Sequence, residues 1–510
     1  MFAIASVFLS AAFLRIYLIS RDSVPFAYDM GRDLLWAKDI SFYGIPTLIG
    51  PAASIWGVYF PPFWFYFLAV PLRLFGGHPL SVVAATAAII VLTGILAFIL
   101  TKSILSKFYA AAFSIFILFS STLINLSTFA FHANMLPIIT LGFIYFSFFS
   151  AAKNPFYFAV SAFLAGLMFS ADPAPAVVFT VTAAVLFLYL KLYKFKHLKK
   201  LTAVCFLAYL IPLAPDILFE IRNNFVQSRS LLAYFRGENP SLSGQLAPIE
   251  RIGNRADAFF DFFKTSFAAD NNLLAGFLLV VITFGVANFF KNYKKREDLI
   301  SLLKINLIVI IASFLVMTFI ITVEIKNWYL YGLTVPAAAI LALSFYGFKN
   351  KKIALVFLAI YLAVNILPFF KNQRTQKSAA DPATLSNQLA AVDYIYKDQQ
   401  DGNFSLYVFT PVVYDYHYQY LFWWRGVVLG RGLPQEFAYL PNQPPYVRNK
   451  NLYAKSGQNT QAIYLIIENA PENEFYSKNN WLANFTDYQI IWEKDINNAI
   501  KIRKIIRGVK

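Results

Sequence analysis

Apolar runs and lysine-rich loops alternate along the first 370 residues, and this alternation constrains the fold more than any other feature. Apolar runs of about 20 residues are typical of helices that cross a lipid bilayer. Loops rich in Lys and Arg stay on the cytoplasmic side, so each one orients the helices beside it. The pattern predicts a multi-pass plasma-membrane protein whose acidic and polar segments lie on the outer face.

Five basic loops can all be placed inside with one set of spans. The loops are Lys102 to Lys107, Lys153, Lys191 to Lys200, Lys291 to Arg296, and Lys349 to Lys352. This placement predicts eleven transmembrane helices, near 2–19, 80–101, 109–129, 134–151, 156–172, 174–192, 201–220, 272–290, 299–322, 328–348 and 353–370. The N-terminus is then inside and residues 371–510 are outside.

One apolar run does not fit this count. Residues 61–76 are short, contain Pro71 and Arg73, and are flanked by segments that both belong outside. We interpret this run as a re-entrant or interfacial helix covered by protein. The long outer segments are 20–60, 221–271 and the C-terminal tail, so we expect a membrane domain over 1–370 and an extracytoplasmic domain over 371–510.

The tail has the pattern of a small α/β or α+β module. Residues 384–397 have helical spacing, with Thr384 as a candidate N-cap. Residues 404–410, 462–467, 488–492 and 499–506 have the composition of strands. The expected fold class is therefore an all-α polytopic membrane protein with a small C-terminal α/β domain.

Composition excludes several other classes. The chain is 58% hydrophobic and 14% charged, whereas soluble domains are about 25% charged. The net charge of +17 is concentrated in short loops, where it sets orientation and contacts membrane lipid, so we do not expect nucleic-acid binding. Cys205 is the single cysteine, which excludes an intrachain disulfide and a metal site built from several cysteines.

The first outer segment contains the most suggestive charged cluster. Asp29 and Asp33 are four residues apart on a predicted amphipathic helix over 29–43 that lies at the membrane surface, and Arg32 can pair with Asp29. A solvated ion-pair cluster of this kind is common and contributes little. The alternative is a general base at the membrane edge, where a shielded carboxylate accepts a proton from an attacking hydroxyl. The residues alone favour neither reading.

Four further outer edges carry polar side chains. Ionisable groups near membrane depth are costly and often functional, although those at helix ends can simply reach water. Arg15 lies near the outer end of the first span, where it can reach water or contact a phosphate. Tyr59 lies among interfacial aromatic residues, for which anchoring is the simpler role. The residues of the four edges that we expect to contact substrate are His132, Asn134, Asp172, Glu220, Arg222, Glu324 and Lys326.

The first outer segment also resembles a known family. Tyr28-Asp29-Met30-Gly31-Arg32-Asp33, followed by Gly50-Pro51 and Pro61-Pro62 with aromatic residues, is similar to the first outer loop of the GT-C membrane glycosyltransferases. The resemblance is to the branch with protein O-mannosyltransferases, the lipid A aminoarabinose transferase and the RgtA/B/C/D-like enzymes. It extends over roughly residues 1–370.

The resemblance implies an activity and a base. Such enzymes move a sugar from a polyprenyl-phosphate carrier to a glycan, lipid or protein acceptor on the outer face. By position the catalytic acid would be Asp29, with Asp33 as the second candidate. Met30, Phe60 and Trp328 depart from residues that many relatives carry, so the cation for the lipid phosphate must come from Lys326, Arg222, Arg32 or Arg15. Some relatives use a divalent metal, and the sequence leaves metal dependence open.

Two other functions compete with the inverting glycosyltransferase. A lipid or sugar transporter, or a flippase, usually has ionisable groups near the midplane and inverted repeats. The span interiors here are almost free of charge and show no repeat. A non-catalytic envelope protein would instead leave Asp29 exposed, with no adjoining cavity. The sequence therefore favours transfer from a lipid-linked donor.

Overall fold

The computed structural model describes residues 2–21, 24–238, 248–321, 324–348, 350–371, 380–399, 404–448, 462–471 and 476–507. Its N-terminal helices are α1 (Phe2–Ile19), α2 (Tyr28–Tyr43), α3 (Phe63–Leu74), α4 (Leu80–Thr101), α5 (Lys107–Leu118), α6 (Ser121–Leu126), α7 (Leu136–Ala152), α8 (Phe158–Leu167), α9 (Pro173–Tyr189) and α10 (Leu198–Leu210). The following helices of the bundle are α11 (Ala214–Arg222), α12 (Val226–Phe235), α13 (Pro248–Ala268), α14 (Asn272–Tyr293), α15 (Glu297–Phe319), α16 (Thr334–Gly347) and α17 (Lys351–Lys371).

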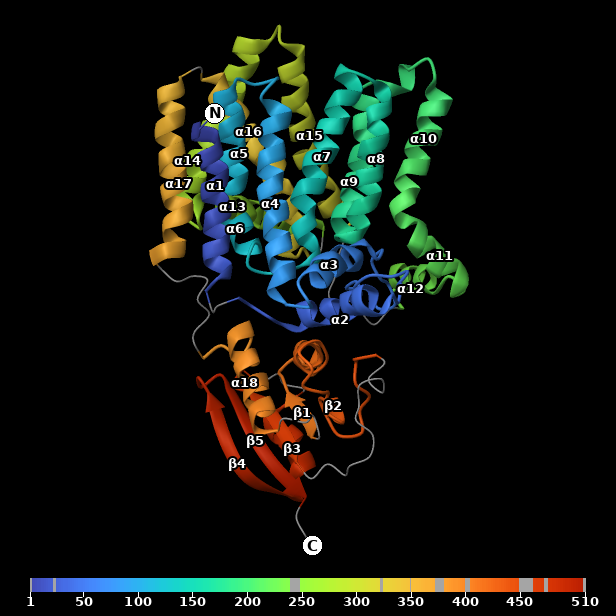
Figure 1. Cartoon of the computed structure of the whole chain (residues 1–510). Helices are drawn as coiled ribbons and strands as arrows, with labels where there is room; N and C mark the ends of the chain where they lie inside the picture. The colour runs from blue at the N-terminus through green and yellow to red at the C-terminus, as the bar shows by residue number, and fades with distance from the viewer. Residues whose placement is uncertain are drawn as a thin grey trace.

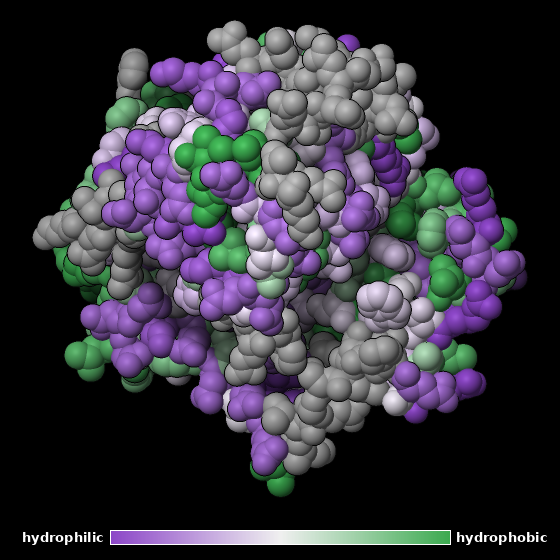
Figure 2. Space-filling model, turned by 90° about the horizontal axis from the view of Figure 1, so that it is seen from below, coloured by the Kyte–Doolittle hydropathy of each residue, from purple (hydrophilic) through white to green (hydrophobic). Residues whose placement is uncertain are grey.

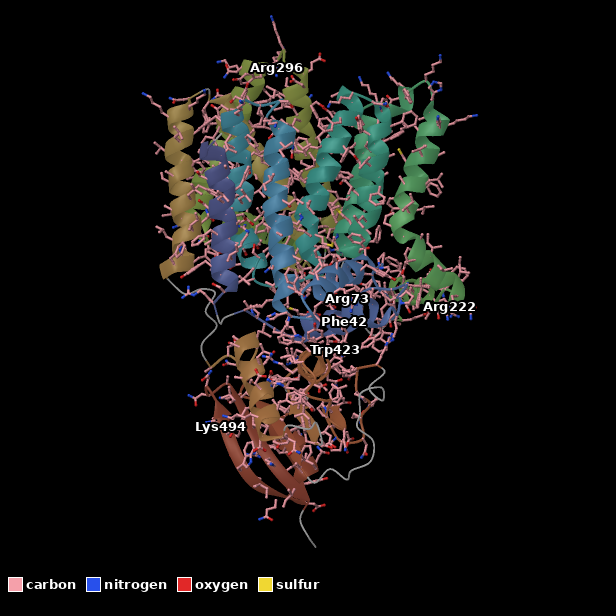
Figure 3. All side chains as sticks on the ribbon, in the orientation of Figure 1. Phe42, Arg73, Arg222, Arg296, Trp423 and Lys494 are labelled. Atoms are coloured by element: carbon pink, nitrogen blue, oxygen red, sulfur yellow. The ribbon has the colours of Figure 1, made fainter. Side chains whose placement is uncertain are left out.

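The long apolar helices stand side by side as a bundle (Figure 1). Among the described residues, seven helices are long and apolar enough to cross a membrane, and five shorter apolar helices accompany them. Arg296 lies at one end of the bundle, and Arg73 and Arg222 lie at the other (Figure 3). Viewed from below, the end that carries the sheet is largely hydrophilic (Figure 2). The predicted fold class, a helical membrane protein with a small C-terminal α/β part, is confirmed.

Several predicted segments differ in detail. The predicted span 109–129 is wrong as a single helix, because it breaks at Phe119 and Ser120 between α5 and α6. The run 61–76 forms the short helix α3, which lies with α2 across the lower end of the bundle (Figure 1). The predicted outer loop 221–271 contains α12 and the 21-residue α13, and α13 packs against α15 and α6.

Arginine side chains satisfy backbone carbonyls where two of these helices end. Arg15 is 2% exposed and donates to the carbonyl oxygen of Leu118, the last residue of α5, at 2.7 Å. Arg255 of α13 donates to the carbonyl oxygen of Met317 at 3.1 Å, in the last turn of α15. The last carbonyls of a helix have no intrahelical partner, and leaving them unpaired in an apolar surrounding is costly. Both arginines therefore stabilise helix ends inside the bundle.

The C-terminal part is built on one mixed five-stranded sheet. Its elements are α18 (Leu385–Asp398), β1 (Ser405–Phe409), α19 (Tyr416–Trp423), β2 (Glu436–Ala438), β3 (Ile463–Glu468), α20 (Lys478–Leu482), β4 (Tyr488–Ile496) and β5 (Ile500–Arg507). The strand order is β2-β1-β3-β5-β4, with β1 parallel to β2 and β3, and β5 antiparallel to β3 and β4. The helix and the four strands expected in the tail are confirmed, whereas β2 and α19 were not predicted.

The helix α2 connects the bundle to the sheet. On one side it packs against α3, where the rings of Trp36 and Phe65 stack at 5.8 Å. On the other side it packs against α19, where Phe42 meets Trp423 edge-on at 5.1 Å (Figure 3). The prediction of a helix here is confirmed, and half of its residues are buried between the two layers.

Gly31 permits the close approach of α2 to α19. A Cβ atom at this position would lie 2.4 Å from the Cα and the backbone nitrogen of His417. Backbone atoms cannot move aside as a flexible side chain can, so a larger residue must separate the two helices. Sequence reasoning noted Gly31 only as part of a motif, and the packing gives its physical role.

We predict that Gly31→Ala lowers stability by about 1–3 kcal/mol, because overpacking forces α2 away from α19. The matched control is Gly276→Ala in α14, where an added Cβ meets nothing within 4 Å and the substitution favours the helix. Thermal unfolding of the full chain in nanodiscs measures both effects. Equal melting temperatures for the two variants would contradict this account.

Candidate active site

The charged cluster at the start of α2 forms a defined network. Arg32 contacts Asp29 Oδ1 through Nη1 at 3.1 Å and Asp33 Oδ1 through Nη2 at 2.7 Å. Asp33 Oδ2 accepts a hydrogen bond from Trp64 Nε1 of α3 at 2.7 Å. The arginine therefore bridges two carboxylates, and the tryptophan fixes one of them.

The two carboxylates differ in environment. The Asp33 side chain is 1% exposed, and burial raises its pKa to about 6, although Arg32 and the hydrogen bonds oppose the shift. Burial alone would lower the pKa of Arg32, but Asp33 and Asp29 together raise it above its usual value, so it stays charged. The Asp29 side chain is 44% exposed. Asp33 therefore holds Arg32 from a buried position, whereas the Asp29 carboxylate remains partly open to solvent.

A second group lies where α7, α9 and α16 begin. Asp172, in the turn before α9, accepts hydrogen bonds from the backbone nitrogen of Ala174 at 3.0 Å and from Trp328 Nε1 at 3.2 Å. The ring of Phe131 meets Trp328 edge-on at 5.6 Å. Burial raises the pKa of the Asp172 carboxyl to about 7, against both hydrogen bonds.

Contacts join this second group to the cluster on α2. His132 packs edge-on against Phe60 at 4.8 Å and hydrogen-bonds the carbonyl oxygen of Ala171 through Nδ1. Its ring lies within electrostatic range of Arg32. The structure therefore brings Asp29, Arg32 and Asp33 together with His132 and Asp172, residues up to 143 positions apart in the sequence.

Three residues that we expect to contact substrate have hydrogen-bond partners within the protein. Asn134 donates to the carbonyl oxygens of Leu126 and Phe129 at 3.0 and 2.6 Å. Glu220 accepts from the backbone nitrogens of Gln227 and Ser228 at 2.9 and 2.8 Å, so it caps the first turn of α12.

Tyr59 is the third of these residues. Its backbone nitrogen donates to Gln227 Oε1 at 2.5 Å, and its ring packs edge-on against Phe219 of α11 at 6.2 Å. Because Gln227 lies in α12, these contacts fix the first outer segment against α11 and α12.

The four candidate cations differ in their partners and in their exposure. Arg15 donates to backbone carbonyls, and Arg32 is held by two carboxylates. Arg222 is exposed at the outer edge of the bundle (Figure 3). Lys326 is 38% exposed and pairs with Glu324, which is 73% exposed, at 2.6 Å. Lys326 is also two residues from Trp328, which contacts Asp172.

Sequence reasoning missed two parts of this site. It treated Trp64 only as an interfacial residue and Trp328 as a residue that departs from relatives, yet their ring nitrogens hold Asp33 and Asp172. The signal available was that a buried Trp N–H needs an acceptor. It also gave no role to the buried pair of Lys38 and Asp39, five and six residues after Asp33 on α2.

The fold is similar to those of solved membrane proteins. ArnT from Cupriavidus metallidurans bound to undecaprenyl phosphate is 13% identical and aligns over 98% of this chain and 97% of its own, with a TM-score of 0.57. The apo form of that protein gives 12% identity and a TM-score of 0.55 over the same shares. The Archaeoglobus fulgidus oligosaccharyltransferase with zinc and sulfate is 14% identical, over 91% of this chain and 68% of that one, with a TM-score of 0.45.

The chain has the GT-C fold. The alignment with ArnT covers nearly all of both chains, so the likeness includes the helical bundle and the C-terminal part together. The resemblance seen in the first outer segment is therefore confirmed at the level of fold. No protein-family model matches the sequence, and no curated protein matches it either.

Among the described ranges, no group of three or more His, Cys, Asp or Glu side chains is placed to hold a metal ion. Asp29 and Asp33 are both directed to Arg32.

We predict that Asp172→Asn changes how stability depends on pH. The folded pKa of about 7 lies above the usual 3.8, so the unfolded chain releases this proton first and the group's contribution to stability is lost as pH rises from about 4 to 7. The amide resembles the protonated carboxyl and does not titrate. As pH rises through that range, the free energy of unfolding of the variant should therefore increase relative to that of the wild type, by up to about 4 kcal/mol. Thermal unfolding in nanodiscs at several pH values measures the difference. Parallel pH profiles would show that the Asp172 carboxyl is not perturbed.

Proposed function

We propose that this chain is a membrane glycosyltransferase that moves a sugar from a polyprenyl-phosphate donor to an acceptor at the outer face. The observation that carries the proposal is Asp29, a half-exposed carboxylate held by Arg32 at the start of α2, in a chain with the GT-C fold. ArnT, which shares this fold, is described with undecaprenyl phosphate bound. The basic loops at the opposite end of the bundle support the outer location of α2 and the sheet.

The proposed reaction is an inverting displacement at the anomeric carbon. Asp29 accepts the proton of the acceptor hydroxyl while that oxygen forms a bond to the anomeric carbon. The bond from the anomeric carbon to the phosphate oxygen breaks, and polyprenyl phosphate leaves as the anion. Arg32 and Asp33 position Asp29, because a fixed base favours the reactive geometry.

Stabilising the departing phosphate requires a cation. We assign this role to Lys326, because its partner Glu324 is an exposed carboxylate and such pairs contribute little. The lysine is therefore able to exchange its partner for a phosphate. Lys326 is two residues before Trp328, whose ring nitrogen donates to the buried Asp172.

We predict that Asp29→Asn lowers transfer by about 10²–10⁴-fold, because the amide cannot accept the proton. The assay follows labelled sugar from an undecaprenyl-phosphate donor in membranes. The matched control is Asp261→Asn on α13, an exposed carboxylate that also pairs with a cation three residues away. Near-normal transfer by Asp29→Asn would disprove the assignment of the base.

We predict that Lys326→Gln weakens binding of undecaprenyl phosphate about tenfold, since a charge-assisted contact to the phosphate is lost. The matched control is Lys264→Gln, which removes another lysine that pairs with a carboxylate. Binding to the full chain in nanodiscs is measured by displacement of a labelled lipid. Equal affinities for the two variants would assign the phosphate cation to another residue.

A further inference from the structure

Buried polar atoms without partners gather at one edge of the sheet. Thr410 and Asp415 are 0% exposed and His417 is 3% exposed. Within the described part of the chain, Thr410 Oγ1, Asp415 Oδ2 and His417 Nδ1 have no hydrogen-bond partner, and neither does the buried Tyr476 Oη. A buried polar atom without a partner costs free energy, so four in one region require an explanation.

All four residues follow the carboxyl ends of two parallel strands. Thr410, Asp415 and His417 come directly after β1, and Tyr476 follows β3, which pairs with β1 in parallel. β2, the next strand along the chain, lies on one side of β1, and β3, which follows β2, lies on the other side of β1. The direction in which strands are added to the sheet therefore reverses at β1. In α/β sheets, ligands bind outside the carboxyl ends of the strands at such a reversal.

A group of tyrosine rings lies over this edge, and we call it the tyrosine cluster: Tyr28, Tyr414, Tyr416, Tyr439 and Tyr446. Tyr414 and Tyr416 stack at 5.7 Å, and the rings of Tyr416 and Tyr446 are 4.3 Å apart. Tyr414 is 42% exposed, so the cluster opens to water. Asp415 lies between Tyr414 and Tyr416 in the chain. Gln419 connects its carboxylate to Tyr446, because Gln419 Nε2 donates to Asp415 Oδ1 at 2.9 Å and Gln419 Oε1 accepts from the Tyr446 backbone nitrogen at 2.6 Å.

The cluster reaches the proposed catalytic base. Tyr28 directly precedes Asp29, and its ring lies 5.1 Å from that of Tyr416 and 5.7 Å from the guanidinium of Arg32. Tyrosine has a broad apolar face and a polar tip. Such faces pack on the C–H faces of sugar rings, while carboxylate, imidazole and hydroxyl groups hydrogen-bond sugar hydroxyls.

We propose that the tyrosine cluster, with the buried Asp415 and His417 next to it in the chain, is the subsite that binds a carbohydrate portion of the acceptor. This inference rests on the proposed glycosyltransferase function, because it places the acceptor hydroxyl beside Asp29. The unpartnered atoms of Thr410, Asp415 and His417 hydrogen-bond the sugar hydroxyls, and the exposed ring of Tyr414 covers one face of the sugar.

The test is direct binding to an immobilised glycan array by the full chain in nanodiscs, which does not depend on transfer. We expect binding to at least one class of neutral oligosaccharide, weakened about tenfold or more by Tyr414→Ala and by Asp415→Asn. Tyr193→Ala is the matched control, because Tyr193 is 44% exposed and lies in a predicted cytoplasmic loop. Tyr414 is partly exposed, so its variant tests binding even where Asp415→Asn reduces folding.

The catalytic variant separates this inference from the proposed function. Asp29→Asn should bind the same glycans as the wild type while it fails to transfer sugar. Absence of glycan binding, or binding that Tyr414→Ala and Asp415→Asn leave unchanged, would overturn the subsite whatever the transfer assay gives. Loss of binding in those two variants supports it even where Asp29→Asn retains transfer.

Discussion

The packing of α2 between two layers is the constraint on which the rest of the structure depends. Asp33 is buried against Trp64 of α3, and Gly31 faces the backbone of His417 in α19. A buried carboxylate requires partners, and Arg32 and Trp64 supply them. The same helix therefore fixes α3 on the bundle, α19 on the sheet, and Asp29 at the boundary of the two.

The sheet is tied to the first outer segment by backbone contacts as well. The Phe26 nitrogen donates to the Ala383 carbonyl oxygen at 2.8 Å, and the Leu385 nitrogen donates to that of Val24 at 2.9 Å. Gln388 of α18, which is fully buried, donates to the carbonyl oxygen of Phe26 at 2.9 Å. These bonds hold α18 at the entry to α2, so the sheet and the proposed base keep a fixed relation.

Polar residues at the helix ends divide into two kinds. Arg15, Asn134 and Glu220 satisfy backbone groups where helices break or begin, which an apolar surrounding makes necessary. Asp29 and Lys326 keep exposed charge on the same end of the molecule. Sequence alone presents both kinds alike, because a polar residue at a predicted helix end has the same pattern whether it caps a helix or meets a ligand.

The sequence by itself determined the helical membrane class, most helix positions and four of the five strands. Hydrophobic runs, basic loops and alternating β-branched residues are local signals, and local signals are enough for such elements. It also indicated Asp29, Arg32 and Asp33 through their spacing on one helix. Only the tertiary structure decided which carboxylate is buried, since Trp64 reaches Asp33 from the separate helix α3. Only the tertiary structure brought the tyrosines that follow β1 against α2. Contacts between residues almost 400 positions apart produce no local pattern in the sequence from which they could be predicted.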